Sequence, residues 1–231
     1  MDLFTTTGRR IETVADWRDH GGPVSGREWA EGRSTRELAT AWVEGTAADE
    51  LTALLSTVPA MDGLLLHEAV ADRENDLLVT ARSPGGTVVV GVQGKADEPV
   101  GEALDTWLTR TRAQEQLDRL TTAFFATTLD VDPLLATLRY ELVAALAGTL
   151  AAAREQEAAR AVLLVHEFET PWTDDALHRR NAEDLERFVG RLMPGVEPAG
   201  HPRAWIAGPA LVRWAGGETE TYVAKLVTST R

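Results

Sequence analysis

Two short apolar runs lie near the middle of the chain, over Asp76–Arg82 and Thr87–Val92. The segment between them, Ser83-Pro84-Gly85-Gly86, favours a turn. An antiparallel hairpin with this four-residue loop pairs the last residue of the first stretch with the first residue of the second. Counting outward from the turn, Asp76 then lies opposite Gln93, and the Cβ atoms of such cross-strand neighbours are about 4.5–5.5 Å apart.

Because successive side chains of a strand point to opposite faces, this hairpin has one apolar and one polar face. The apolar face consists of Leu77, Val79, Ala81, Val88, Val90 and Val92. The polar face carries Asp76, Gln93 and Lys95, with Thr80 and Arg82 further along. The pattern therefore predicts that one face covers a core while an acid, an amide and an amine converge on the other.

Helical spacing of apolar residues predicts helices in the rest of the chain. The predicted helices cover residues 11–18, 35–44, 48–56, 102–120, 133–156 and 174–192. The sequence Ser34-Thr35-Arg36-Glu37 is typical of a capping box, and Asp132-Pro133 is typical of a helix start.

Further strands are predicted on both sides of the long helices. An apolar run over residues 64–70 precedes the hairpin, and the continuous apolar run 161–168 is typical of a buried parallel strand. Short strands at 203–207, 210–214 and 221–227 form a small C-terminal β meander. The sequence thus predicts an α/β fold, with a mixed sheet flanked by helices.

The same pattern suggests how the chain is divided. Residues 1–60 form an N-terminal helical arm that packs on the core, and residues 61–193 form the α/β core. Residues 194–231 form a C-terminal β extension. We expect one compact domain overall, because 231 residues are enough to bury a substantial core.

Composition excludes several classes of site. The chain has no cysteine, so disulfides and thiolate metal sites are ruled out, and its five histidines show no paired ligand spacing. The start of the sequence lacks the apolar segment of a secretory signal. The longest apolar tract, residues 142–153, is too short to span a bilayer. We therefore expect a cytoplasmic protein with no membrane partner.

The net charge of −13 disfavours a nucleic-acid partner. Affinity for DNA comes largely from Lys and Arg side chains that neutralise phosphates, and an acidic protein repels the same phosphates at long range. A nucleic-acid-binding function would need a local positive groove or divalent cations.

The arrangement of Asp76 and Gln93-Gly94-Lys95 on paired strands resembles the motif of the PD-(D/E)XK nuclease superfamily. Members carry an Asp on one strand and an acidic-x-Lys triplet on the next. Gln93 stands where Asp or Glu is usual, which makes this a QxK variant like those of some restriction-type and Mrr-like members. The surrounding segments ENDLLVTAR, VQGKADEPVG, LRYELV and AVLLVHEF also resemble a group of uncharacterised bacterial proteins, over roughly residues 29–192.

The resemblance implies a restriction-endonuclease-like fold and metal-dependent hydrolysis of phosphodiester bonds, in DNA rather than RNA. It implies that Asp76, the side-chain oxygen of Gln93 and Glu68 ligate Mg²⁺ or Mn²⁺. Lys95 would position or deprotonate the attacking water and stabilise charge on the phosphate. Because Gln93 removes a negative charge from this site, we expect weak metal binding.

Other residues are candidates for supporting roles, each with a simpler structural alternative. Arg82 and Gln114 are candidate substrate-binding residues, although an Arg beside a turn and a Gln on a polar helix face are often merely exposed. Tyr140 and Glu141 occupy the place where relatives carry a polar pair early in a long helix. His166, near the end of the buried strand, is a candidate to approach the site or a plain strand-end residue.

Two further interpretations stay open. Asp76 and Lys95 are also compatible with an ordinary surface ion pair, and Glu68 with a solvated acid. The chain is then either a catalytically degenerate nuclease-like scaffold that binds a protein or nucleic acid, or an unrelated α/β protein. Homodimers are common among nucleases of this type, so the resemblance also makes a homodimer a candidate assembly.

Overall fold

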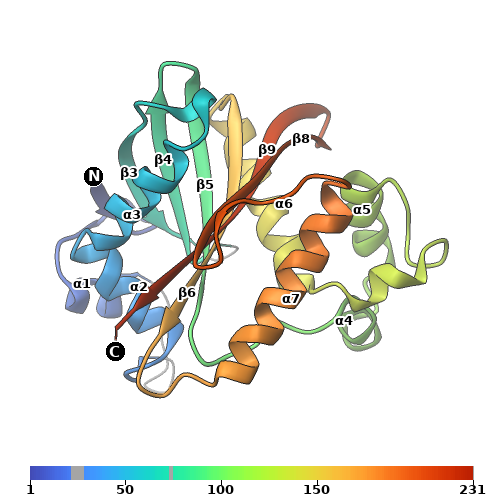
Figure 1. The fold of residues 1–231 in the computed structure, drawn as a ribbon, viewed down its shortest axis with the longest axis horizontal. Coiled ribbons are helices and arrows are strands. Elements are labelled where there is room, and N and C mark those ends of the chain that lie inside the picture. The colour runs from blue at the N-terminus through green and yellow to red at the C-terminus, as the bar shows by residue number, and fades with distance from the viewer. Residues whose placement is uncertain (22–28, 73–74, 231) are drawn as a thin grey trace.

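The computed structural model describes residues 1–21, 29–72 and 75–230. Within these residues, nine strands form one mixed sheet in the order β2-β1-β3-β4-β5-β6-β9-β8-β7 (Figure 1). The strands are β1 (Asp2–Phe4), β2 (Arg10–Ile11), β3 (Leu65–Ala71), β4 (Leu77–Ser83), β5 (Gly86–Lys95), β6 (Arg160–Glu169), β7 (Ala199–His201), β8 (Ala204–Trp214) and β9 (Gly217–Ser229). The predicted α/β class is confirmed.

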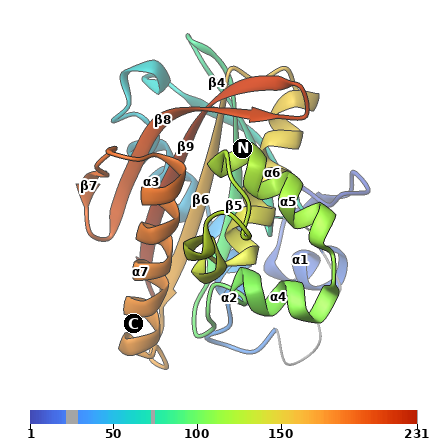
Figure 2. The ribbon, with the colours of Figure 1, turned by 90° about the vertical axis from the view of Figure 1, so that its right-hand side faces the viewer.

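Helices cover both faces of this sheet. They are α1 (Val14–His20), α2 (Ser34–Val43), α3 (Thr46–Leu55), α4 (Leu104–Thr111), α5 (Gln114–Phe125), α6 (Tyr140–Glu155) and α7 (Asp175–Leu192), with 3-10 turns η1 (Pro59–Met61) and η2 (Pro133–Thr137). The first three helices lie on one face, and α4–α7 lie on the other (Figures 1 and 2).

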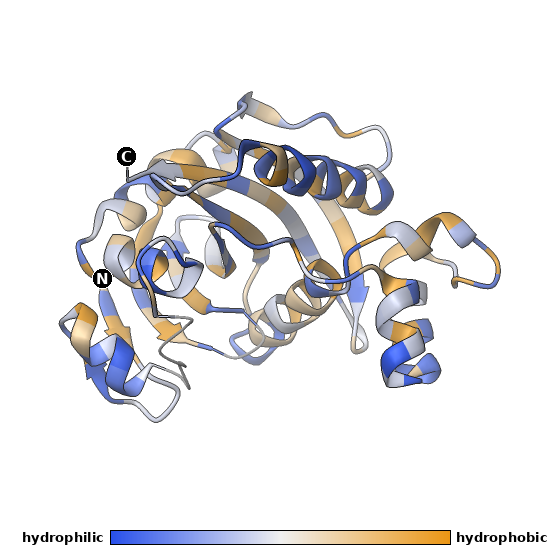
Figure 3. Cartoon of the chain, turned by 90° about the horizontal axis from the view of Figure 1, so that it is seen from below, coloured by the Kyte–Doolittle hydropathy of each residue, from blue (hydrophilic) through white to orange (hydrophobic). Residues whose placement is uncertain are grey.

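The sheet separates two apolar cores. One core joins α1–α3 to side chains such as Val79 and Val90, and the other joins α4–α7 to side chains such as Val89 and Leu163. Figure 3 shows the strands in the middle of the molecule mostly in the colours of hydrophobic residues. In the part of the chain that the structure describes, no helix is long and apolar enough to cross a membrane.

The predicted hairpin register is confirmed. Arg82 pairs with Thr87 and Leu77 pairs with Val92, so Asp76, one residue before β4, continues the register toward Gln93. All six residues of the predicted apolar face are fully buried. The loop is shorter than predicted, because Ser83 also pairs with Gly86 and leaves two residues in the turn.

The chain order brings three strand ends together at one edge. After the antiparallel strands β3, β4 and β5, the helices α4–α6 lead back to β6, which runs parallel to β5. Strand β9 is parallel to β6 and lies between β6 and β8. The C-terminal residues therefore belong to the same sheet as the core, and β5, β6 and β9 end on the same side.

Two predicted helices differ from the structure. The helix predicted over residues 102–120 is divided into α4 and α5, because Arg112 adopts a left-handed conformation with φ 56°. The helix predicted from Pro133 begins instead at Tyr140. Residues before it form the turn η2, and Arg139 is extended and forms a β bridge with Ala103.

The N-terminal segment also contains more regular structure than predicted. Strand β1 pairs with β2 and, in parallel, with β3, so this arm extends the sheet. The capping box predicted at Ser34 is absent, because Ser34 is already the first helical residue. Glu37 instead accepts a hydrogen bond from the amide of Gly32 at 2.9 Å.

Candidate functional site

Charged side chains occupy the carboxyl ends of β5, β6 and β9 on the face covered by α6 and α7. Lys95, Glu167 and Lys225 are 5%, 2% and 6% exposed, although each belongs to a residue type that is seldom buried. Lys95 and Glu167 are in register on neighbouring parallel strands. The carboxyl ends of parallel strands are the usual ligand-binding edge of an open α/β sheet, so this edge is the candidate site.

Asp76 also lies at this edge, because the β4–β5 hairpin places it beside the end of β5. Its Oδ2 atom accepts a hydrogen bond from the amide of Gly94 at 2.8 Å, which fixes the carboxylate beside the end of β5. Gln93 is 3% exposed, whereas the side chain of Asp76 is open to solvent. The structure thus brings together the acid, amide and amine that the sequence predicts, with the acid on the accessible side.

The surroundings of Asp76 change its acidity. Burial among protein atoms raises the pKa of Asp76 even though solvent reaches the side chain, and the negative charges of Glu141 and Asp72 act in the same direction. The positive charge of Lys95 and the amide of Gly94 oppose this shift. A carboxylate that is accessible yet disfavoured in its charged form would gain stability from a cation beside it.

Lys95 is held by Glu141, the second residue of α6. The ammonium group forms an ion pair with Oε1 of Glu141, and the Lys95 side chain is 7% exposed. Burial alone would lower the pKa of Lys95, but Glu141 and Asp76 outweigh that effect and raise it. Lys95 is therefore charged at neutral pH, which suits charge stabilisation and not the removal of a proton from water.

A third carboxyl group, Glu98, completes the surroundings of Lys95. Burial raises the pKa of Glu98, while a hydrogen bond with Ser34 and the charge of Lys95 lower it. Among the described residues, however, no three His, Cys, Asp or Glu side chains are grouped so that they could hold a metal ion. The oxygen donors suited to Mg²⁺ are the carboxylate of Asp76 and the amide oxygen of Gln93. This set fits Mg²⁺, which often takes only one or two carboxylates and fills its other positions with water and phosphate oxygens.

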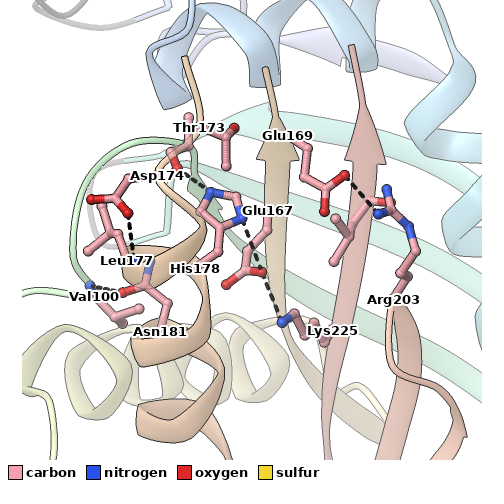
Figure 4. A network of polar contacts seen from close by, with 12 residues as sticks. Val100, Glu167, Glu169, Thr173, Asp174, Leu177, His178, Asn181, Arg203 and Lys225 are labelled. Atoms are coloured by element: carbon pink, nitrogen blue, oxygen red, sulfur yellow. Dashed lines mark hydrogen bonds and ion pairs between the residues drawn. The ribbon is translucent and has the colours of Figure 1, made fainter. Parts of the chain in front are cut away.

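A second charged group lies beside the first, around Glu167 (Figure 4). Its Oε2 atom lies 2.9 Å from Nζ of Lys225 and 3.9 Å from Nδ1 of His178. The other ring nitrogen of His178 hydrogen-bonds to the carbonyl of Ala96. Asn181 also ties α7 to the segment after β5, because its side chain bonds the amide of Val100 and the carbonyl of Glu98.

Glu68 is not brought to this site. A register shift between Leu66 and Glu68 places Glu68 opposite Thr80, four positions along β4 from Asp76. At about 3.3 Å per residue, this separation is roughly 13 Å. Thr80 in turn bonds Gln156 at the far end of α6 from Glu141. The expectation that Glu68 is a third metal ligand is therefore wrong, because the pairing of β3 with β4 places it several positions toward the turn from Asp76, and alternation within a strand does not reveal this pairing.

The two candidate substrate-binding residues are also placed elsewhere. Arg82 is exposed at the turn end of β4, six positions from Asp76 and thus roughly 20 Å along the strand. Gln114 donates a hydrogen bond to Asp118 on the same helix at 2.8 Å. No hydrogen bond or ion pair within the described residues joins either side chain to Asp76.

His166 faces the opposite side of the sheet. It is fully buried near Trp42, and its Nε2–H donates to the hydroxyl of Thr228, which donates in turn to Glu50. Burial lowers the pKa of His166 to about 3. Of the two alternatives for His166, the structure contradicts an approach to the site, and the next residue, Glu167, lies there instead.

Tyr140 and Glu141, the polar pair expected early in the long helix, make different contacts. Tyr140 stacks on Trp107 with ring centroids 3.8 Å apart, and Glu141 alone reaches Lys95. Sequence reasoning missed Lys225 as a site residue. Its signal is a lysine inside the apolar run that forms β9, where a charge needs a buried partner.

Comparison with known proteins finds one family. A family model described as "Domain of unknown function (DUF6946)" matches residues 10–205, which include Asp76, Gln93, Lys95 and Glu167 but not Lys225. No curated protein and no solved structure matches the chain.

Proposed function

The chain belongs to the DUF6946 family, and from the geometry of its site we propose that it is a metal-dependent nuclease. It hydrolyses phosphodiester bonds at the edge formed by Asp76, Gln93 and Lys95, in DNA rather than RNA, and acts in the cytoplasm. The observation that carries the proposal is the convergence of these three side chains at the ends of paired strands, with Oδ2 of Asp76 bound to the amide of Gly94.

The order of elements supports a restriction-endonuclease-like core within this proposal. Helices α2 and α3 precede the antiparallel strands β3, β4 and β5, and helices α4–α6 then lead to β6, parallel to β5. This is the helix, three-strand, helix, strand order that the resemblance implies. The hairpin β4–β5 carries the candidate catalytic residues at its open end, opposite the turn.

Each residue has a defined part in the proposed reaction. Asp76 and the side-chain oxygen of Gln93 would hold Mg²⁺ or Mn²⁺, and the bound ion would supply a water of lowered pKa and polarise a phosphoryl oxygen. The ammonium group of Lys95, kept charged by Glu141 and Asp76, stabilises negative charge on the phosphate. Glu141 acts as a positioning residue, because it contacts Lys95 and not the substrate.

A second function is favoured by the charge of the molecule. The net charge of −13 and the amide at Gln93 both weaken a nuclease site, since they repel phosphate and leave fewer negative ligands. The alternative is a catalytically degenerate scaffold that binds a protein or nucleic acid without cleaving it.

The test is cleavage of single- and double-stranded DNA and of RNA, with Mg²⁺ or Mn²⁺ and with chelator. We expect metal-dependent DNA cleavage, which Asp76→Asn and Lys95→Met abolish while the fold, checked by circular dichroism, is retained. Glu68→Gln is the matched control and keeps full activity, because Glu68 lies away from the site. The nuclease proposal fails if no nucleic acid is cleaved and neither metal raises the melting temperature of the unmodified protein.

A further inference from the structure

A cavity of about 540 Å³, lined by both charged and apolar residues, lies next to the candidate catalytic edge, beyond Glu167. The carboxyl ends of β6 and β9, helix α7 and the β7–β8 hairpin form its walls. The residues that matter for its chemistry are Glu167, His178, Arg179, Arg203, Trp205 and Lys225. The volume is within the usual range of small-molecule sites, which combine apolar walls with a few convergent polar groups.

Hydrogen-bond acceptors that lack donors lie at the buried base, or floor, of this cavity. Oε1 of Glu167 is buried and has no hydrogen-bond partner, whereas Oε2 pairs with Lys225. A carbonyl can only accept, so the bond between Nε2 of His178 and Ala96 fixes the proton on Nε2. In the neutral ring, Nδ1 of His178 is then a second acceptor, 3.9 Å from the carboxylate of Glu167 (Figure 4).

This floor selects a ligand with N–H donors. Two neighbouring acceptors fit a flat group that carries two adjacent N–H groups. A divalent cation is disfavoured, because the ammonium group of Lys225 already lies 2.9 Å from the same carboxylate. The ring of Trp205 and the side chain of Pro202 also line the cavity and supply apolar surface for such a flat group.

The rim of the cavity carries two arginines that can bind an anion, beside the acids Glu169 and Glu186. Arg179 is exposed, and no ion pair joins it to an acid in the described part of the chain. Arg203 lies on the same rim, pairs with Glu169 at 2.7 Å and keeps 42% of its side chain exposed. A nucleotide combines N–H donors for the floor with a negative group for the rim.

We propose that this cavity binds one nucleotide, with the donor edge of its base toward Glu167 and His178 and its phosphate at Arg179 and Arg203. Guanine fits best, because its N1–H and N2–H₂ groups are adjacent donors. The nucleotide is either a residue of a nucleic-acid strand or a free mononucleotide. The strand source rests on the proposed function, since Lys95 and Glu167 are neighbours in register and a bound strand would reach both.

The experiment is isothermal titration calorimetry with the full chain and no metal, using GMP, UMP, guanosine and inorganic phosphate. We expect GMP to bind roughly tenfold or more tightly than UMP, the discrimination typical of a paired donor–acceptor contact. Glu167→Gln removes this preference, and His178→Phe tests the same floor should Glu167→Gln fail to fold. Arg179→Gln weakens GMP but not guanosine, and the surface variant Arg213→Gln, whose pair with Glu218 lies on the β8–β9 hairpin, changes neither.

Three results would overturn the proposal: no nucleotide binding, phosphate binding as tight as GMP binding, or an unchanged preference for GMP in both floor variants. A short single-stranded DNA containing one guanine separates the two sources. Tighter binding of this strand than of GMP supports the strand source, and the reverse supports a free nucleotide. Because the assay measures no cleavage, an inactive protein that binds GMP contradicts the nuclease proposal alone, and an active protein that does not bind GMP contradicts this one alone.

Discussion

Lys95 and Glu167 lie in register on the parallel strands β5 and β6 and point to the same face of the sheet. Each has an oppositely charged partner on its outer side, Glu141 for Lys95 and Lys225 for Glu167. Negative and positive charges therefore alternate along this row. Removing one member of a buried pair leaves its partner uncompensated, which costs more than the pair itself contributes.

Glu141→Gln tests the end of the row at Lys95. We expect the free energy of unfolding to fall by about 2 kcal/mol, less than for a fully buried pair because the Glu141 side chain is 32% exposed. Glu102→Gln is a matched control: Glu102 is 31% exposed, but its partner Arg110 is 62% exposed and tolerates the loss, so less than about 1 kcal/mol is expected. Urea denaturation at neutral pH measures both, and equal losses would contradict the special role of Lys95.

Lys225→Met tests the end of the charged row at Glu167. The side chains of Lys225 and Glu167 are 8% and 2% exposed, so a lone Glu167 carboxylate should destabilise the protein by about 3 kcal/mol. The double variant Glu167→Leu, Lys225→Met removes both charges and should recover at least half of this loss. Denaturation of the single and double variants gives the comparison. A double variant no more stable than the single one would show that packing, and not charge, determines the effect.

The buried His166 should make the stability of the folded protein sensitive to acid. Its pKa is about 3 in the folded protein against an ordinary value of 6.5, so between these values the unfolded state binds more protons. Stability from this group is present above the ordinary value and is lost as the pH falls, by about 3 kcal/mol between neutral pH and about pH 4. His166→Phe should remove this part of the pH dependence, measured as the difference in unfolding free energy at the two pH values. An unchanged difference would show that His166 does not titrate in this way.

At Gly91, strand β5 packs so closely against α6 that there is no room for a side chain. A Cβ atom at this position would lie 2.0 Å from Oγ1 of Thr149 and 2.6 Å from Oδ1 of Asn75. Gly91→Ala should therefore destabilise the protein by about 3 kcal/mol, the upper range for overpacking. Gly190→Ala in α7 is the control, because its Cβ meets nothing within 4 Å and alanine should stabilise the helix by roughly 0.5–1 kcal/mol. Thermal unfolding of the two variants should give shifts of opposite sign.

The hairpin could be predicted from the sequence because two independent local signals agree. The turn sets the register that pairs Arg82 with Thr87, and the apolar positions of the two strands agree with it. The same register positions Asp76 and Lys95. Glu68 could not be placed in the same way. The irregularity that moves it opposite Thr80 arises in the pairing of β3 with β4, and side-chain alternation within β3 alone does not report it.

The sequence also does not predict which way the side chains point on a strand that is buried on both faces. Strand β6 is apolar on both faces, so the pattern does not say which of His166 and Glu167 points toward α7. The partners Glu141 and Lys225 depend on how α6 and β9 pack against the sheet, over separations of 46 residues from Lys95 and 58 residues from Glu167. Local periodicity carries no information over such distances.

Strand β9 has a consequence for synthesis of the protein. It fills the place between β6 and β8, yet it is translated about fifty residues after β6. Until its residues leave the ribosome, the backbone groups along one side of β6 have no neighbour to bond. An apolar strand with an open side is prone to join other chains, so we expect a nascent polypeptide paused before Gly217 to aggregate more readily than the full-length chain.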